Sequence, residues 1–371
     1  MKVWPGLGIV LIQCFLCFAH WFIFHTWMSF WPLEPAGAHA LAAALMVLSI
    51  SFVAAALLGY RSSTLLVEIF YRIAAVWLGF LNFFFWAACL CWLVALVGSV
   101  TTGGLHGDAR RVVAGILYGA AILTSLYGLA NARRIRERRL MVQLEKLPAT
   151  WRGRTALLIS DIHLGHVNGA GFARRVAELA QHLNPDIVFI AGDLFDGSKA
   201  DPDRLAGPLF TLAPPLGIYF CGGNHEDFGD ADAYSAALSR GGMHVLQNRR
   251  VDVDGLRVIG VNYADTTYPM RLRSFLDGLH LDSGQASILL NHVPNRLPLV
   301  EHAGVSLQLS GHTHGGQMFP FTWITRRAFG KYTYGLQRFG KLQVLTSSGV
   351  GTWGPPMRVG TAPEVVLITF A

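Results

Sequence analysis

Charged residues are scarce in this sequence of 371 residues. Asp, Glu, Lys and Arg together make up 14% of it, against 52% for hydrophobic residues, whereas ordinary soluble chains carry about 25% charged residues. This composition excludes intrinsic disorder, because a disordered chain has too few apolar side chains to form a core. It also excludes a fully soluble enzyme.

Cysteine is sparse as well, with five residues in the chain. Cys14, Cys17, Cys89 and Cys91 lie within apolar runs, and Cys221 ends another. No even series of cysteines is spread across loops, which argues against a disulfide framework. The Cys14–Cys17 pair lacks the polar, partly exposed surroundings of a reactive dithiol, so we interpret it as apolar packing within a helix.

An excess of acidic residues is also missing, since the net charge is +7. Residues 1–150 hold 11 basic against 5 acidic residues, whereas residues 151–371 hold 19 against 18. A nucleic-acid-binding domain would carry the basic excess on its own folded surface. We therefore expect no nucleic-acid partner.

Long apolar runs are what the first part of the chain does contain. A helix needs about 20 apolar residues to cross the hydrocarbon core of a bilayer. Four runs approach or exceed that length, and the first is too long for the apolar region of a cleaved signal peptide. Residues 1–130 are therefore predicted to form four transmembrane helices, over Leu7–Trp31, Ala36–Tyr60, Ile73–Val100 and Val112–Ala130.

Basic residues near the ends of these runs predict the orientation, because they accumulate on the cytoplasmic side. With four spans both ends of the chain lie on one side, which carries nine basic residues: Lys2, Arg61, Arg72, Arg133, Arg134, Arg136, Arg138, Arg139 and Lys146. The other side carries two, Arg110 and Arg111. We expect residues 151–371 to lie in the cytoplasm.

A basic segment follows the last run. Asn131–Lys146 mixes arginines with aliphatic residues, which predicts a juxtamembrane helix on an anionic leaflet or a plain positive stop after the last span. We expect residues 131–150 to form a linker and residues 151–371 to form one domain.

Residues 151–371 show the pattern of a layered α/β fold, in which strands alternate with helices and the C-terminal part is rich in strands. Helical spacing is found over Phe172–Leu183 and Ala231–Arg240. Short apolar runs predict strands at Thr155–Ser160, Asp186–Gly192, Gly217–Cys221, Leu256–Gly260, Ser287–Leu290, Val305–Ser310, Leu342–Thr346 and Val365–Phe370.

Side chains that can bind metal follow five of these strands directly. Ligand sites in open α/β sheets lie at the carboxyl ends of strands, so the five endings are expected to converge. They read Asp161-Ile162-His163, Gly192-Asp193-Leu194-Phe195-Asp196, Gly222-Gly223-Asn224-His225-Glu226, Asn291-His292 and Gly311-His312-Thr313-His314.

This mixture of imidazoles and carboxylates suits two divalent ions of Mn, Fe or Zn better than Mg. One shared carboxylate can hold two ions about 3.5–4 Å apart, and a hydroxide between them attacks a phosphoryl group at neutral pH. A nearby histidine can protonate the leaving oxygen.

The ordered motifs D-x-H, G-D-x-x-D, G-N-H-E, H and G-H-T-H resemble those of calcineurin-like metallophosphoesterases, and are most similar to a membrane-associated bacterial phosphodiesterase branch. The resemblance covers residues 151–371, including Tyr332–Gly335, Ser347–Arg358 and Pro363-Glu364. It implies a layered metallophosphoesterase domain of α/β (α+β) class behind the four spans. It also implies a multi-pass protein of the cell (inner) membrane.

The resemblance also implies roles for single residues. Asp161, His163 and His314 would hold one metal, Asn224, His292 and His312 the other, and Asp193 would bridge them. His225 would be the general acid, with Glu226 beside it to orient the imidazole, and Asp196 would close a turn. Other histidines fit no motif and are expected at surface or capping positions: His166, His182, His244, His280 and His302.

The segment after the last motif, Gln317–Arg327, is apolar and aromatic and then basic. Read as a loop beside the metals, it would admit an acyl chain at the bilayer surface, with Phe321 and Trp323 on the lipid and Arg326 or Arg327 on a phosphate. The alternative is a loop packed on its own domain.

The sequence therefore favours a membrane-anchored phosphoesterase that hydrolyses a phosphodiester or pyrophosphate bond of a lipid-linked substrate by attack of a metal-activated hydroxide. One alternative keeps this chemistry on a soluble nucleotide-type phosphoester. Another is a non-catalytic membrane sensor or scaffold with a metal-binding domain, against which the complete ligand set and His225 argue.

Overall fold

The computed structural model describes residues 4–101, 103–281 and 284–371. These residues fall into two compact units. The first contains the chain up to Ala130 together with Gly354–Met357, and the second contains Asn131–Trp353 and Arg358–Ala371.

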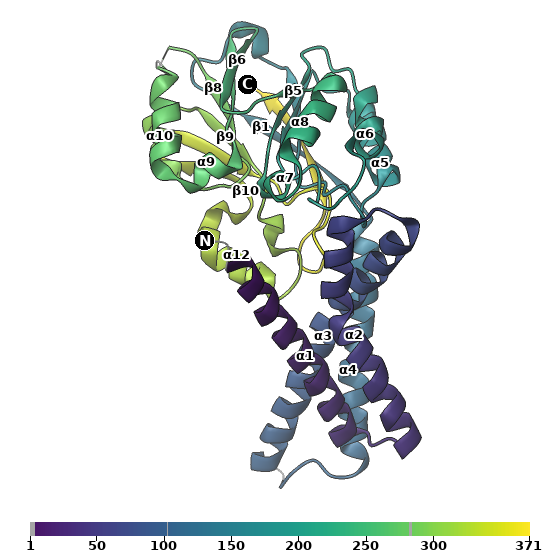
Figure 1. The fold of residues 1–371 in the computed structure, drawn as a ribbon. Helices are drawn as coiled ribbons and strands as arrows, with labels where there is room; N and C mark the ends of the chain where they lie inside the picture. Colours follow the sequence, from purple (N-terminus) through teal and green to yellow (C-terminus); the bar gives the residue numbers. More distant parts are fainter. Residues whose placement is uncertain (1–3, 102, 282–283) are drawn as a thin grey trace. The chain divides into compact units, whose positions relative to one another are not determined.

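Four long helices make up most of the first unit (Figure 1). They are α1 (Trp4–Phe30), α2 (Pro35–Arg61), α3 (Leu65–Thr101) and α4 (Asp108–Ala132). Each is long and apolar enough to cross a membrane, which confirms the four predicted spans and makes the chain a multi-pass membrane protein. Helix α3 begins at Leu65, earlier than predicted, and its added first turns contain Glu68 and Arg72, which form an ion pair at 3.6 Å one turn apart.

Polar side chains connect α1 to α3 across the helix interface. The indole nitrogen of Trp77 donates to Nε2 of His20 at 2.8 Å, and that of Trp92 donates to the Thr26 hydroxyl at 2.8 Å. Such bonds between helices stabilise a bundle in lipid, where water offers no alternative partner. His20 is therefore a packing residue of the helix bundle.

The second unit is built on two six-stranded sheets (Figure 1). The order of the first is β1-β12-β2-β3-β4-β5, and that of the second is β10-β11-β9-β8-β7-β6. All eight predicted strands are present, and β1, β5, β6 and β10 are additional. The bounds are β1 (Arg136–Val142), β2 (Thr155–Ile159), β3 (Ile187–Ala191), β4 (Ile218–Cys221), β5 (His244–Val245), β6 (Arg249–Val253), β7 (Leu256–Gly260), β8 (Ser287–Leu290), β9 (Leu307–Ser310), β10 (Gly335–Phe339), β11 (Leu342–Thr346) and β12 (Glu364–Phe370).

Strand β1 corrects the expectation of a juxtamembrane helix over Asn131–Lys146. It pairs in parallel with β12, from Arg136 opposite Glu364 to Val142 opposite Phe370. Val142 is fully buried while its neighbour Met141 is exposed, the alternation of a strand with one face on a core. The aliphatic residues of this segment therefore face the protein core, not a leaflet.

Helices cover the outer faces of both sheets. Buried side chains of α5 pack on β2, β3 and β4, whereas those of α10 and α11 pack on β7, β8 and β11. A third core lies between the two sheets and includes Leu158, Phe189, Ile288 and Leu309. The result is a four-layered α/β sandwich, which confirms the predicted layered α/β fold. Its helices are α5 (Ala170–Leu183), α6 (Pro202–Ala206), α7 (Asn224–Phe228), α8 (Ala231–Arg240), α9 (Tyr263–Thr267), α10 (Pro269–Gly278), α11 (Leu297–His302) and α12 (Phe321–Phe329).

Trp151 allows a test of the core between the sheets. Its ring is fully buried and packs edge-on against Phe370, and its indole nitrogen donates to the Val253 carbonyl at 3.0 Å. Trp151→Ala should destabilise the domain by about 3–5 kcal/mol, which lowers the melting temperature of the full chain in detergent by roughly 10 °C. The exposed Trp323→Ala is the control, and equal melting temperatures for the two variants would contradict this packing.

Candidate metal centre

The carboxyl ends of five strands bring the predicted metal-binding side chains together. Asp161 and His163 follow β2, and Asp193 follows β3. Asn224 and His225 open α7 directly after β4. The remaining three, His292, His312 and His314, follow β8 and β9. Strands from both sheets therefore supply the cluster, in the way that the sequence pattern predicts.

Three overlapping groups of side chains have potential ligand atoms within 4.8 Å of one another. Asp161, His163 and His314 form what we call the first ligand group. Asp193, His292 and His312 form the second ligand group, and a middle group joins His163, Asp193 and His225. Asp193 and His163 each belong to two of the three groups, so these two side chains connect the cluster.

The backbone at these residues adopts a conformation that non-glycine residues rarely use. The φ angle is +53° at Asp161, +51° at His163, +52° at Asp193, +68° at His312 and +49° at His314. Left-handed non-glycine residues are uncommon and cluster at functional sites, where the surrounding structure holds them. Five of them in one cluster indicate a site whose geometry is maintained against local preference.

Two glycines beside the cluster are required by close contacts. A Cβ atom on Gly223 would lie 2.2 Å from Oδ1 of Asp193, and one on Gly311 would lie 2.2 Å from Oδ2 of Asp161. Any side chain at either position would displace a carboxylate of the cluster. The motifs G-N-H-E and G-H-T-H therefore contain glycine at these positions because no room is left for a Cβ atom.

The first ligand group contains facing atoms that repel one another unless a proton or cation lies between them. Nε2 of His163 lies 3.0 Å from Nε2 of His314, and the latter lies 3.5 Å from Oδ1 of Asp161. Two buried polar atoms in this group, Oδ2 of Asp161 and Nδ1 of His163, have no hydrogen-bond partner. Buried polar atoms without partners are costly, so this donor set fits a bound divalent cation.

The second ligand group is oriented by its surroundings. Nδ1 of His292 contacts the Ala191 carbonyl at 2.8 Å, so it carries the proton, and Nε2 points at Oδ2 of Asp193 at 3.1 Å. Nδ1 of His312 lies 2.9 Å from Oδ1 of Asn224 and 3.3 Å from Nε2 of His292. A histidine whose second nitrogen is held by a carbonyl is the usual arrangement at metal sites.

Burial and mutual charge shift the pKa values in the cluster in opposite directions. Burial raises the pKa of Asp161 to about 6 and lowers the pKa of His312 to about 4, with the charge of His292 adding to the effect. Burial also holds the pKa values of His163 and His314 well below their usual range. These three imidazoles are therefore neutral at pH 7, the form that binds metal.

Asp193 and His292 form a tightly coupled pair. Although burial opposes both charges, the neighbouring Asp193 raises the pKa of His292 to about 10, and His292 holds the pKa of Asp193 well below its usual range. The Asp193 carboxylate thus attracts a positive charge strongly in the protein alone.

Glu226 has a different role from the one expected. Its carboxylate accepts from the backbone N–H groups of Asp193 at 3.0 Å, Phe195 at 2.9 Å and Gly223 at 2.6 Å. It therefore holds the loop of Asp193, whereas the His225 ring contacts the Asp196 carbonyl through Nδ1 at 2.9 Å. The expectation that Glu226 orients the His225 imidazole is wrong, because its carboxylate is occupied by backbone donors.

Asp196 closes a turn, as expected, by accepting from the Ser198 backbone at 2.8 Å. His166 differs from its expectation, because it is buried rather than on the surface. The other histidines without a motif are exposed: His182, His244, His280 and His302.

The segment predicted as a loop after the last motif contains helix α12. Phe321, Trp323, Arg326 and Arg327 all lie on this helix, and none belongs to the three ligand groups. Its last residue, Phe329, places its ring 6.0 Å from that of His312. The helix therefore borders the cluster without contributing a ligand.

Arg358 and Trp353 contact the cluster and were not expected from the sequence. The Trp353 ring lies 5.7 Å from that of His225, and the Arg358 guanidinium lies 3.2 Å from Nδ1 of His314. The available signal was Arg358 itself, because it is the single charged residue in the stretch 347–358. A charge alone among small and apolar residues indicates a buried partner.

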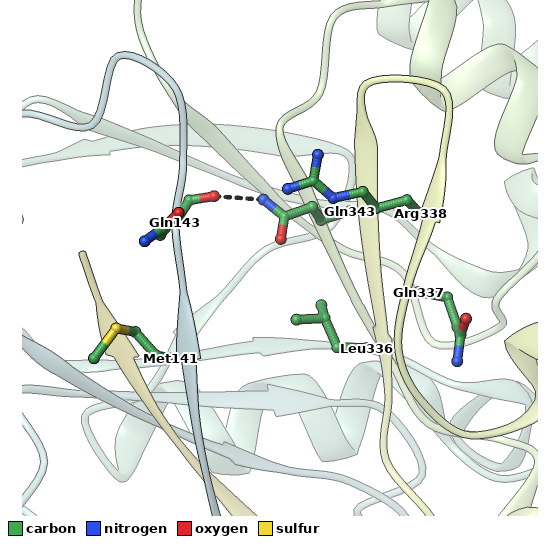
Figure 2. A pocket seen from close by; sticks show the side chains of 6 residues that line it. All are labelled: Met141, Gln143, Leu336, Gln337, Arg338 and Gln343. Carbon is green, nitrogen blue, oxygen red and sulfur yellow. Dashed lines mark hydrogen bonds between the residues drawn. The ribbon is translucent and has the colours of Figure 1, made fainter.

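A separate groove of about 440 Å³ lies where the edges of the two sheets meet (Figure 2). Its lining residues come from β1, β10, β11 and Gln143, and the Gln343 side chain donates to the Gln143 carbonyl at 2.6 Å across it. The groove shares no residue with the ligand groups among the described residues. It therefore does not belong to the metal centre.

Comparison with known proteins agrees with this geometry. The family model described as calcineurin-like phosphoesterase matches residues 154–316. An uncharacterized metallophosphoesterase of Aquifex aeolicus is 33% identical over 259 residues, which cover 67% of this chain and 97% of that protein. The chain belongs to the calcineurin-like metallophosphoesterase family.

Relatives in this family include membrane proteins. A transmembrane protein with a metallophosphoesterase domain from Danio rerio is 32% identical over 282 residues, which cover 71% of this chain. The chain spans 63% of that protein's length. The crystal structure of a dimetal phosphatase from Danio rerio aligns with 59% of this chain and all of its own, at a TM-score of 0.36 and 14% identity.

Glu226 provides a test of how the Asp193 loop is held. Glu226→Gln keeps the shape of the side chain but replaces one acceptor oxygen by an amide donor, which faces a backbone N–H. Leaving a buried donor without an acceptor costs about 1–3 kcal/mol, so we expect the affinity for Mn²⁺, measured by calorimetry, to fall about tenfold or more. The neighbouring Asp227→Asn should bind Mn²⁺ like the parent chain, and unchanged affinity in Glu226→Gln would show that the loop does not depend on it.

Proposed function

We propose that this protein is a membrane-anchored two-metal phosphoesterase that hydrolyses a phosphodiester or pyrophosphate bond of a lipid-linked substrate. The observation that carries the proposal is the convergence of buried histidines and aspartates into overlapping ligand groups at five strand ends. The pyrophosphate or diester preference, the substrate and the residue roles below are parts of this proposal.

Seven residues would hold the two cations. Asp161, His163 and His314 would bind the first ion, Asn224, His292 and His312 the second, and Asp193 both. When bound, the cations would withdraw negative charge from phosphoryl oxygens and make the attacking water more acidic. Support comes from the orphaned atoms of the first ligand group and from the oriented imidazole of His292.

His225 would donate a proton to the leaving oxygen. Its Nδ1 atom is held by the Asp196 carbonyl, and its backbone N–H donates to Oδ1 of Asp193 at 2.9 Å. The ring packs edge-on against His163 at 4.6 Å between centroids. These contacts fix the imidazole at the edge of the cluster, so that it need not reorganise during the reaction.

Helix α12 supports a substrate with an apolar part. No residue of the helix is buried, and its outward residues include Trp323, 70% exposed, and Ile324, 53% exposed. Arg326 and Arg327 lie in its last turn. Exposed aromatic and aliphatic side chains beside two arginines match a substrate with an acyl chain next to a phosphate better than they match a nucleotide.

The catalytic domain is proposed to face the cytoplasm, and the metals to be Mn, Fe or Zn. The orientation rests on the nine basic residues at one set of span ends against two at the other. The metal class rests on the imidazole-rich ligand set, which Mg²⁺ seldom uses.

Substitutions at Asp193 and His225 separate metal binding from proton donation. Asp193→Asn should lose both bound metal and hydrolysis of phosphodiesters. His225→Ala should keep two ions per chain, and its rate should fall by about 10²–10⁴ for an alkyl leaving group. For a p-nitrophenyl ester, whose p-nitrophenolate leaves without needing a proton, the loss of rate in His225→Ala should be much smaller.

Metal content measured by mass spectrometry and turnover of the two esters check both variants. The exposed His182→Ala serves as the control and should resemble the parent chain. A His225→Ala variant that slows both esters equally would contradict proton donation, and one that loses metal would make His225 a ligand.

Replacing Phe321 and Trp323 together by Ser tests the lipid-linked substrate. Turnover of a lipid pyrophosphate in mixed micelles should fall at least about tenfold, because an apolar contact worth about 1.5–3 kcal/mol per buried side chain is lost. Turnover of a soluble phosphodiester should stay unchanged. Met270→Ser, an exposed apolar residue on α10, is the matched control, and an equal decrease for both substrates would favour the nucleotide-type alternative.

A further inference from the structure

Arg358 is fully buried. Among the described residues, it is the only charged side chain in the group of the largest fully buried side chains. Its hydrogen bonds go to carbonyls and a hydroxyl, whereas the carboxylates of Asp161 and Glu364 act on its charge without a described hydrogen bond to it. A buried charge with no carboxylate in direct contact is costly and must be stabilised by oriented dipoles. The contacts of this guanidinium therefore need an explanation beyond packing.

Apart from the Thr361 hydroxyl, 3.5 Å from Nη1, those contacts lie on loops of the metal centre. Nη1 donates to the His314 carbonyl at 3.1 Å, and Nη2 donates to the carbonyls of Gly349 at 3.1 Å and Gly351 at 2.6 Å. Nη2 also lies 3.2 Å from Nδ1 of His314. A neutral imidazole has one lone-pair nitrogen, so a His314 ring that binds a cation through Nε2 carries its proton on Nδ1 and accepts nothing from the guanidinium there. The carbonyl oxygen of His314 is therefore the atom through which Arg358 holds this residue.

The loop of Gly349 and Gly351 supports Asp161 in turn. The Gly351 N–H donates to the Asp161 carbonyl at 2.8 Å, and the Val350 N–H donates to the Ser160 carbonyl at 2.9 Å. A Cβ atom on Gly349 would lie 2.6 Å from Cβ of Asp161. One side chain thus connects His314 to the backbone against which Asp161 rests.

The second ligand group has no such connection. Its members are held by the Ala191 carbonyl, by Asn224 and by one another, and none of the described hydrogen bonds of Arg358 reaches them. Removal of the guanidinium should therefore affect the two ligand groups unequally.

We propose that Arg358 is a positioning residue for the first metal alone, because its guanidinium holds the His314 backbone and the loop behind Asp161 through their carbonyl groups. This inference rests on the proposed metal roles. Lysine would not replace it, since a single ammonium on a shorter stem cannot donate to His314, Gly349 and Gly351 together.

The test compares Arg358→Lys and Arg358→Met with the parent chain, all purified at full length in detergent. Equilibrium dialysis against Mn²⁺ should give two ions per parent chain and one per Arg358→Met chain. In Arg358→Lys the first ion should bind about 10–100-fold more weakly, the usual effect of removing a group that orients a ligand. The electron paramagnetic resonance signal should change from a coupled pair of Mn²⁺ ions to an isolated ion.

Further substitutions identify the ion that remains. In the Arg358→Met chain, His292→Ala should remove the last ion and His163→Ala should not. Arg154→Met is the matched control, because Arg154 pairs with Asp254 and contacts no ligand, so this variant should keep two coupled ions.

Arg358→Lys that binds both ions as tightly as the parent would overturn the proposal, whether or not Arg358→Met folds. Loss of both ions at once, or loss of the second before the first, would overturn it too. A parent chain that binds no Mn²⁺, Fe²⁺ or Zn²⁺ would instead overturn the two-metal function on which it rests.

Discussion

The structure depends on a cluster of buried lone pairs that repel one another. Two carboxylates and several imidazoles form three overlapping groups, and the ligand atoms within each group lie within 4.8 Å of one another. Such an arrangement costs free energy unless cations compensate it, because burial removes the water that would otherwise solvate these groups. The rest of the domain can be understood as the framework that keeps these groups together.

That framework works at three levels. Sheets buried on both sides supply the strand ends from which the ligands project. Left-handed turns then direct Asp161, Asp193 and His312 inward. Finally, two buried charged groups bind backbone atoms: Glu226 accepts N–H groups around Asp193, and Arg358 donates to carbonyls around His314. The acidic side chain thus holds backbone N–H groups, and the basic side chain holds backbone carbonyl groups.

Much of the fold and the cluster could be predicted, because each strand and the ligand after it are adjacent in sequence. Strand β1 could not, since its apolar face is completed only by β12, which is distant in the chain. Helix α12 is short and has no side-chain cap, so local signals are weak. Glu226 and Arg358 bind backbone groups, which every sequence possesses, and no residue pattern marks such partners.

The pairing of β1 with β12 has a consequence for synthesis. Strand β12 lies between β1 and β2 in the finished sheet, yet it emerges from the ribosome after both. Until it arrives, the nascent domain exposes two open edges next to a bilayer that already holds the preceding helices, and open edges invite pairing with other chains. Strand β12 therefore closes both edges in one step, by pairing with β1 on one side and with β2 on the other.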